Sequence, residues 1–252
     1  NCFTIDYTKG NDINNTSISA LSESDLISNN KFTIKEGIAL TYANIGIKST
    51  CTIEGYGSLY LNVTTLSDAF ITGNSKGALK YAVLNNTSTT STITVASLLN
   101  QSFDIVSNGS ITSTGKLKLL TEQLSNTKLN KYLIVIYADE SKIANDAASA
   151  SFNGTVSADA NQGKVPYEGL AKLIANDTFA PNSTATNNGI TYQYDTIHSL
   201  MKDNAGNIRY YGVEPNNYIY FNCSDYSNQS SSTCETWRII GVFEGKIKLI
   251  RG

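Results

Sequence analysis

Short runs of β-forming residues, separated by clusters of polar turn residues, recur along most of this chain. Within 59–63, Leu59, Leu61 and Val63 alternate with Tyr60 and Asn62, which is the pattern of a strand that buries one face. Strands that recur about every 8–12 residues are typical of all-β sandwiches. The sequence therefore predicts a mainly β protein, an antiparallel β-sandwich or jelly roll, and not a parallel α/β sheet. Further strands are expected at 2–7, 32–34, 38–47, 51–53, 69–71, 81–84, 93–95, 103–106, 115–123, 133–137 and 152–158.

The hydrophobic pattern changes after Gly163, where a short helical connector is expected. Pro166 opens a helical run, since proline is well tolerated in the first turn of a helix. A polar spacer follows at 181–189, and a second short helix is expected over 194–201. The apolar faces of the two helices would be Leu170, Leu173 and Ile174 in the first, and Ile197, Leu200 and Met201 in the second.

The C-terminal segment holds the only tryptophan and the densest run of β-forming residues. Residues 218–221 form a predicted strand, and 237–242 leads through Glu244-Gly245 into 246–251. A β-hairpin is expected there, because glycine adopts the positive φ angle that a tight turn needs. Lys246, Lys248 and Arg251 would mark its wetter face and discourage uncontrolled pairing. The chain is thus expected to comprise a β-sandwich domain at 1–162, a helical connector at 163–205 and a disulfide-stapled β tail at 206–252.

The four cysteines are even in number and fall into two well-separated pairs. No Cys-x-x-Cys motif occurs, and the lone histidine cannot complete a Cys/His zinc site. Disulfides formed in an oxidising, extracellular compartment are the better interpretation. Of the three possible connectivities, we favour Cys2–Cys51 and Cys223–Cys234.

Composition argues against several classes of function. Charged residues make up 16% of the chain and the formal net charge is −2, so no nucleic-acid partner is expected. No apolar run approaches the roughly 18 residues of a membrane-spanning helix. The chain begins with Asn1-Cys2 and not with methionine, as a processed secreted protein would. We therefore expect a secreted protein, extracellular or on the cell surface, without a membrane span.

No set of residues suited to catalysis or to a cofactor stands out. His198 is the only histidine, and no nucleophile–base pair can be nominated around it. The pair Asp139-Glu140, and Asp203 with Asn204 and Asn207, could offer oxygens to calcium, but no complete calcium-binding loop motif is present. Solvated turns are the simpler interpretation of these acidic residues. We expect no enzymatic activity, no cofactor and no metal site.

Two parts of the predicted sandwich resemble a known family. The apolar run KYLIVIYADE at 131–140 ends in an acidic pair and leads through a polar loop to SFNGTV at 151–156. Earlier, KSTC at 48–51 precedes the alternating strand at 59–63. These segments resemble the TasA/camelysin family over roughly the first 160 residues. The resemblance implies a secreted jelly-roll subunit that builds extracellular fibres by donating an N-terminal strand to its neighbour. The tail is similar to a segment of uncharacterised surface proteins of Gram-positive gut bacteria.

Two functions are compatible with these patterns. The first is a structural subunit of an extracellular filament or biofilm-matrix fibre, in which copies of the chain join head-to-tail through a terminal strand. The sequence leaves open which terminus supplies it. The strand candidates are Phe3, Ile5 and Tyr7 at one end, and Trp237, Ile239, Ile247 and Leu249 at the other.

The alternative is a monomeric cell-surface adhesin or glycan-binding module. Aromatic side chains of the tail would stack against host or matrix glycans in that case, although the same side chains also suit a hydrophobic core or an interface. They are Tyr210, Tyr211, Tyr218, Tyr220 and Trp237.

Overall fold

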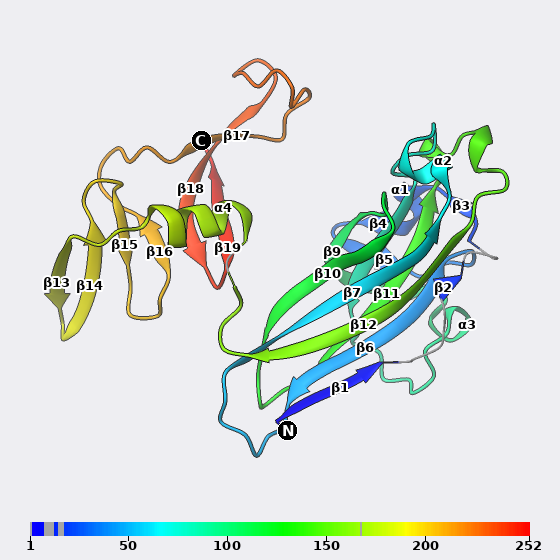
Figure 1. The fold of residues 1–252 in the computed structure, drawn as a ribbon, viewed down its shortest axis with the longest axis horizontal. Helices are drawn as coiled ribbons and strands as arrows, with labels where there is room; N and C mark the ends of the chain where they lie inside the picture. The colour runs from blue at the N-terminus through cyan, green and yellow to red at the C-terminus, as the bar shows by residue number, and fades with distance from the viewer. Residues whose placement is uncertain (1, 8–12, 15–17, 167) are drawn as a thin grey trace. The chain divides into compact units, whose positions relative to one another are not determined.

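The computed structural model describes residues 2–7, 13–14, 18–166 and 168–252. The chain divides into two compact units, Asn1–Lys164 and Val165–Gly252, close to the boundary predicted at residue 162. Figure 1 labels most of the strands and the α-helices of both units. The chain is mainly β, as predicted, and most of its strands pair antiparallel.

The first sheet of unit 1 contains eight strands. They are β1 (Phe3–Tyr7), β3 (Ala20–Leu21), β4 (Ile27–Ser28), β5 (Lys31–Thr33), β6 (Ala39–Ile47), β8 (Leu79–Asn85), β9 (Ser102–Ser110) and β11 (Asn130–Asp139). The spatial order is β1-β6-β11-β8-β9-β5-β4, and the short β3 pairs with β11 in parallel. The long strand β11 is therefore central to this sheet.

The second sheet of unit 1 packs against the first to form the predicted β-sandwich. Its strands are β2 (Ile13–Asn14), β7 (Gly55–Leu66), β10 (Gly115–Leu124) and β12 (Phe152–Gln162), in the order β10-β7-β12-β2. Ile45 and Ile134 of the first sheet and Leu61, Phe152 and Val156 of the second belong to one buried cluster. This cluster is the core between the two sheets.

A second core lies on the opposite face of the first sheet. Leu133, Val135 and Tyr137 belong to it, whereas their neighbours Ile134 and Ile136 face the sandwich core. Side chains alternate between the faces of a strand, so the apolar run of β11 fills both cores. The short helices α1 (Glu23–Leu26) and α3 (Val95–Leu98) contribute buried leucines to this second core. The loops of unit 1 also form α2 (Asp68–Ile71), η1 (Glu140–Lys142) and η2 (Asn145–Ala147).

Unit 2 is a single antiparallel sheet covered by one helix. The helix α4 (Gly169–Lys172) continues as the π-helical turn η3 (Leu173–Thr178), and the strands are β13 (Ser183–Asn187), β14 (Ile190–Asp195), β15 (Leu200–Lys202), β16 (Ile208–Tyr210), β17 (Tyr218–Phe221), β18 (Glu235–Phe243) and β19 (Lys246–Arg251). Their order is β13-β14-β15-β16-β18-β17, with β19 also paired to β18. Seven buried residues form the core of this unit: Ala171, Ile174, Ala175, Leu200, Ile208, Ile239 and Val242.

The predicted division of unit 2 into a helical connector (163–205) and a separate tail (206–252) is wrong. Strand β15 pairs with β14 on one side and with β16 on the other, so both segments form one sheet. The polar spacer at 181–189 is strand β13 and the tight turn that follows it. Asn188 and Gly189 have φ angles of 49° and 78°, and Asn-Gly is the strongest short-range signal for a hairpin turn.

The second helix predicted at 194–201 is also wrong. Residues 190–195 form β14, the chain turns, and β15 begins at Leu200. The carboxylate of Asp195 accepts hydrogen bonds from the backbone N–H groups of Ile197 and His198, and Ser199 has a φ angle of 54°. A side chain that satisfies these backbone donors stabilises a turn in place of a helix.

The first predicted helix is present, but it buries a different face. Leu170 and Leu173 are 39% and 52% exposed, whereas Ala171, Ile174 and Ala175 are buried. Positions spaced three and four residues apart lie on one side of a helix, and this set includes small alanines that let the helix approach the sheet closely.

Three short strands predicted in unit 1 do not form. Residues 51–53 are irregular, 69–71 lie in α2, and 93–95 lead into α3. At the last of these, Thr94 and Ser97 form a reciprocal capping box, which is a helix-start signal. Local capping therefore outweighs the β-branched composition at that position.

Candidate functional site

Strand β1 is the N-terminal candidate for contact with another subunit. It pairs antiparallel with β6, from Phe3 opposite Ile47 to Tyr7 opposite Ala43, and it stands at one end of the strand order. Phe3 packs against the sandwich core, while Ile5 is 38% exposed. The side chain of Tyr7 lies outside the described residues. Strand β1 is thus built into its own sheet.

A disulfide anchors β1 to its own unit. Cys2 is joined to Cys51 with an S–S distance of 2.07 Å, the connectivity favoured from the sequence. The backbone N–H of Lys48 also donates to the carbonyl of Cys2 at 2.8 Å. Donation of the whole strand to a neighbour would have to break the pairing with β6 while this covalent link still held its start. Pairing along the outer edge of β1 requires no such rearrangement.

The C-terminal strand candidates also pack within their own unit. Ile239 is buried, and Ile247 and Leu249 pack against the same core. Trp237 is half-buried, donates from Nε1 to Glu235 at 2.9 Å and meets the Phe221 ring edge-on at 5.7 Å. The predicted hairpin of β18 and β19 is confirmed, with Glu244 and Gly245 in the turn at φ angles of 51° and 81°.

Strand β19 carries charges that oppose further strand addition. Lys246, Lys248 and Arg251 are all exposed along it, and Arg251 forms an ion pair with Glu235 at 3.3 Å. Natural sheets use lysines in this way to keep edges from pairing with other chains. The tail hairpin is therefore a poor candidate for a docking edge.

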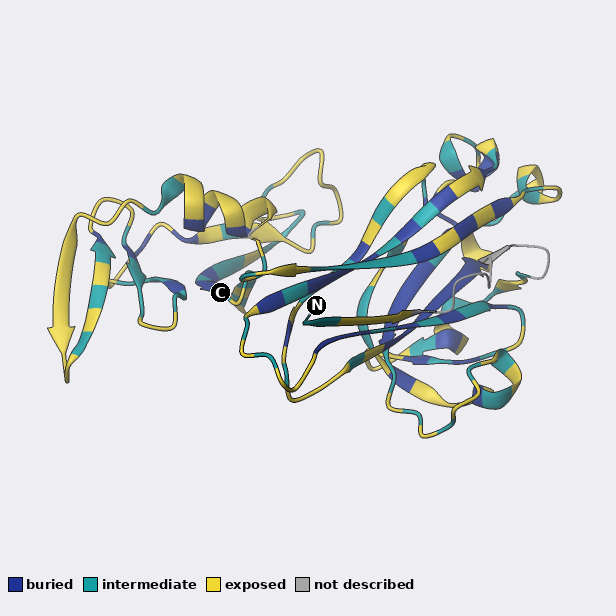
Figure 2. Ribbon diagram, turned by 60° about the horizontal axis from the view of Figure 1, so that its bottom comes forward, coloured by how far each residue is buried: buried dark blue, intermediate teal, exposed yellow. Residues whose placement is uncertain are grey.

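Strand β13, at one end of the strand order of the same sheet, has no such charges. Its residues Ser183–Asn187 read STATN, and all five are exposed. Figure 2 shows this strand exposed along its length at the far left of the view. It contains no charged residue and no proline, and among the described residues it pairs with β14 alone. This edge therefore lacks the charges that protect β19.

The hairpin register defines which backbone groups of β13 face outward. Asn187 and Ile190 flank the two-residue turn, so they form a hydrogen-bonded pair, and pairs then alternate along the hairpin. Thr184 and Thr186 fall at the non-hydrogen-bonded positions, where side chains approach more closely; the hydroxyls of Thr186 and Thr191 are 3.0 Å apart. The backbone N–H and C=O groups of Thr184 and Thr186 therefore point away from β14.

An exposed aromatic surface surrounds β17. Tyr218, Tyr220, Phe221 and Tyr226 are 55%, 43%, 45% and 59% exposed. The guanidinium of Arg238 lies over the ring of Tyr218 at 5.2 Å. Of the aromatic residues singled out in the sequence, Tyr218 and Tyr220 are exposed, whereas Tyr210, Tyr211 and Trp237 are half-buried. Four aromatic side chains of β17 and the loop after it are thus left largely exposed.

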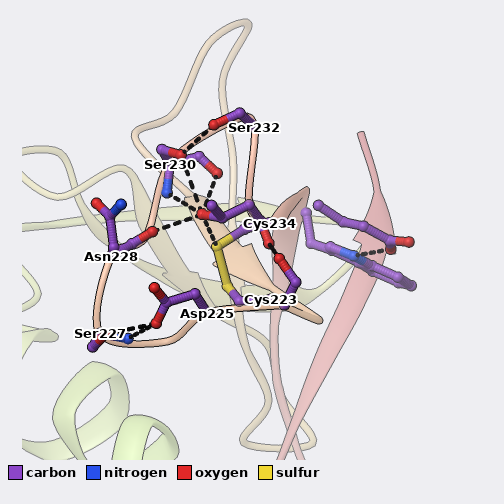
Figure 3. The surroundings of a disulfide bond; sticks show 11 residues. Cys223, Asp225, Ser227, Asn228, Ser230, Ser232 and Cys234 are labelled. Carbon is purple, nitrogen blue, oxygen red and sulfur yellow. Dashed lines mark hydrogen bonds between the residues drawn. A yellow bond between two sulfur atoms is a disulfide. The ribbon is translucent and has the colours of Figure 1, made fainter.

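The loop after β17 is closed by the second disulfide, Cys223–Cys234 (Figure 3). Asp225 accepts hydrogen bonds from the backbone and hydroxyl of Ser227, at 2.9 and 2.6 Å. These bonds lower the pKa of the Asp225 carboxyl. The hydroxyl of Thr233 donates to the carbonyl of Asn228 at 2.7 Å. These polar groups are thus hydrogen-bonded within the loop, while the side chain of Tyr226 is exposed to solvent.

Asp195 and His198 are hydrogen-bonded to each other in the turn between β14 and β15. Nδ1 of His198 lies 2.8 Å from Oδ2 of the fully buried Asp195 side chain. Burial alone would raise the pKa of Asp195, but hydrogen bonds from Ala180 N–H and from His198 outweigh it and lower the pKa to about 2. Both oxygens of the carboxylate accept hydrogen bonds that stabilise the turn between β14 and β15.

Asp203 plays the same structural role in the next turn. It accepts hydrogen bonds from the backbone of Ala205 and Asn207 and from the Arg209 guanidinium at 3.0 Å. Burial would raise its pKa, but the bonds from Asn207 and Arg209 lower it. Across 2–7, 13–14, 18–166 and 168–252, no group of three His, Cys, Asp or Glu side chains could hold a metal ion.

Comparisons with protein families, curated proteins and solved structures found no match to this chain. The resemblance to the TasA/camelysin family therefore stays a prediction. In the part of the chain that the structure describes, no helix is long and apolar enough to cross a membrane.

The sequence reasoning missed the β13 edge. The sequence signal for this edge is the turn pair Asn188-Gly189. It lies between two short runs, STATN and ITYQYD, and this arrangement is typical of a β-hairpin.

Proposed function

We propose that the protein is a structural subunit of an extracellular filament whose copies join by pairing of exposed strand edges. The observation that carries the proposal is the β13 edge, which is exposed over all five residues and carries no charge. Natural proteins usually protect such an edge with lysine, proline or a bulge. An edge without protection is suited to accepting a strand from another molecule.

The partner edge that we propose is β1 of the next copy. It has the same length as β13, stands at the end of its sheet order and exposes Thr4, Ile5 and Asp6. Main-chain hydrogen bonds between the two edges would supply affinity. The contact joins unit 2 of one copy to unit 1 of the next and leaves the same pair of edges open at the ends, so it builds a filament and not a closed dimer.

This arrangement differs from donation of a whole terminal strand. The Cys2–Cys51 disulfide and the pairing of β1 with β6 favour a strand that stays in its own subunit. Two disulfides suit an oxidising compartment, which agrees with a secreted or cell-surface location for such a filament.

The test is assembly of the full chain measured by sedimentation velocity over a concentration series. Thr184→Pro removes an outward N–H of β13 but no hydrogen bond to β14, a change that edge strands tolerate. We expect it to raise the concentration needed for assembly about fivefold, since each lost hydrogen bond costs about 1 kcal/mol.

Thr184→Ala is the matched control, because it changes the same side chain and keeps the N–H. It should assemble like the wild type. A wild type that stays monomeric at all concentrations would refute the filament, and equal assembly of both variants would refute the β13 edge.

A second candidate, a glycan-binding adhesin, is favoured by the exposed aromatic surface around β17. Aromatic side chains left in water are suited to stacking against the apolar faces of sugars, and Tyr218, Tyr220 and Tyr226 supply three such rings. Binding of the monomer to a glycan array, lost in a Tyr218→Ala/Tyr220→Ala double variant and kept in Tyr192→Ala, would support it. No binding by the wild type would exclude this alternative for the glycans on the array.

A further inference from the structure

The side chain of Lys80 lies on the same face of the first sheet as the second core of unit 1. Residue 80 of β8 is opposite Tyr137 of β11, and directly opposed residues share a face. Asp139, two residues beyond Tyr137, lies on that same face. Strand alternation thus brings a lysine and an aspartate together beside the apolar side chains that fill this core.

A third charged group completes the cluster. Lys80 Nζ lies 2.8 Å from Oδ2 of Asp139 and also contacts the carboxylate of Glu23. Glu23 is the first residue of α1, and the same short helix buries Leu26 in the second core. One amine is therefore held between two carboxylates that come from different elements.

The cluster is largely shielded from solvent. The side chains of Lys80 and Asp139 are 14% and 5% exposed, and Tyr137, with its ring 5.4 Å from that of Phe32, is 1% exposed. Only Glu23, at 37%, reaches toward solvent. A poorly hydrated site lowers the concentration of water that would reverse a condensation.

We propose that Lys80 and Asp139 condense to an intramolecular amide, with Glu23 as the group that moves the protons. Nζ of Lys80 forms a bond to Cγ of Asp139, and one carboxyl oxygen of Asp139 leaves as water. The ammonium and the carboxylate together become one amide and one water molecule, and Glu23 ends as it began. The step needs no oxidant, reductant or further reactant.

Proton transfer within the cluster starts the reaction. Burial lowers the pKa of Lys80 and raises that of Asp139, but their mutual hydrogen bond and the contact with Glu23 outweigh it, so the pKa of Lys80 is raised and that of Asp139 lowered. The pair is therefore ionic at the outset. Transfer of a proton from Lys80 to Asp139 by way of Glu23 gives the neutral amine and acid that react, with no change in total charge.

Asp139 is also held in a suitable orientation. Its Oδ1 accepts hydrogen bonds from the backbone N–H and the hydroxyl of Ser141, at 3.1 and 2.7 Å. These donors stabilise charge on the oxygen that stays as the amide carbonyl, while Oδ2 faces the amine. Holding the reacting groups in contact replaces an encounter from solution.

A second lysine–aspartate pair provides an internal comparison. Lys31 Nζ lies 2.6 Å from Asp104 Oδ1 on the neighbouring strands β5 and β9, but the two side chains are 51% and 60% exposed. Water surrounds this pair, so we expect it to remain an ordinary ion pair. The amide link would join β8 to β11 covalently within the central sheet, whether or not the chain assembles.

The experiment is intact-mass spectrometry of the purified chain after unfolding and reduction of the disulfides. The wild type should be lighter than its sequence by one water, and tandem spectra should place the link between Lys80 and Asp139. Lys80→Arg and Glu23→Gln should restore the full mass, while Lys31→Arg should keep the loss. Lys80→Arg retains the positive charge beside Asp139, and circular dichroism confirms that each variant is folded.

A folded wild type with the full sequence mass would overturn the proposal. Loss of water mapped to other residues would overturn the assignment, and a folded Glu23→Gln variant that still lost water would overturn the role of Glu23.

Discussion

The two units of this chain use β-sheets in opposite ways. In unit 1, β11 is buried from Tyr132 to Asp139 and its two faces fill two different cores. In unit 2, one helix covers the sheet, the core holds seven buried residues, and β13 is exposed along its whole length. Unit 1 thus buries its central strand on both faces, whereas unit 2 leaves the whole of β13 and several aromatic side chains exposed.

Within unit 2, two of the edge strands also differ from each other. Strand β19 has three exposed cations, and β13 has no charge over five residues. Both are edge strands with a tight Gly-containing turn, so the difference lies in side-chain chemistry alone. Charges on β19 and none on β13 agree with the proposal that copies of the chain pair through β13.

The largest effect should come from truncating an aromatic side chain in unit 1. Phe152→Ala, at a side chain that is fully buried, should lower the free energy of unfolding of unit 1 by about 3–5 kcal/mol. Phe221→Ala in unit 2 makes the same change at a side chain 45% exposed and should cost about 1 kcal/mol or less. Urea denaturation with NMR signals assigned to each unit measures both. An equal loss of unfolding free energy in the two variants would contradict the proposed difference in packing between the two units.

A smaller effect is expected where two strands of unit 2 come closest. A Cβ at Gly241 would lie 2.1 Å from the carbonyl oxygen of Ile208, and this backbone atom cannot rotate away. Gly241→Ala should therefore cost about 1–3 kcal/mol and weaken the β16–β18 pairing. Trp237 fluorescence during thermal unfolding reports the change.

Gly189→Ala is the comparison, because a Cβ there meets no atom within 4 Å while φ is 78°. It carries only the conformational cost of about 1 kcal/mol. A larger loss at Gly189 than at Gly241 would contradict the steric account.

The last prediction is a pH dependence of the stability of unit 2, to which Asp195 contributes. The pKa of Asp195 is lowered to about 2 in the folded state, below the ordinary value near 3.9 of an unfolded chain. Its stabilisation is therefore fully present above about pH 4 and is lost as pH falls toward 2. Trp237 fluorescence should show the unfolding midpoint of unit 2 dropping in that window. Asp195→Asn should flatten this dependence, and an unchanged slope in that variant would exclude Asp195 as its source.

Patterns in the sequence predict much of unit 1 and less of unit 2. Alternation within 59–63 and the apolar run at 131–140 identify β7 and β11. A strand that buries one face alternates apolar and polar residues, and a strand that buries both faces is apolar throughout. Short elements are set by local hydrogen bonds instead, as at Asp195, whose carboxylate makes a turn where apolar spacing suggests a helix.

The candidate surfaces were predicted only in part. Both disulfide connectivities agree with the sequence-based choice. The residues Ile239, Ile247 and Leu249 were expected at an interface but pack inside their own unit, since an apolar strand is equally suited to a core. The β13 edge is polar on both faces, so hydrophobicity gave no sign of it, and only the Asn188-Gly189 turn marks its place.

The most direct test of the β13 edge is amide hydrogen exchange at Thr184 and Thr186 in the monomeric and the assembled protein. Both N–H groups point away from β14, so they should exchange rapidly in the monomer. Assembly through this edge predicts strong protection at these two positions and at the outward amides of β1. Filaments in which Thr184 and Thr186 still exchange rapidly, or a chain that never assembles, would contradict the account.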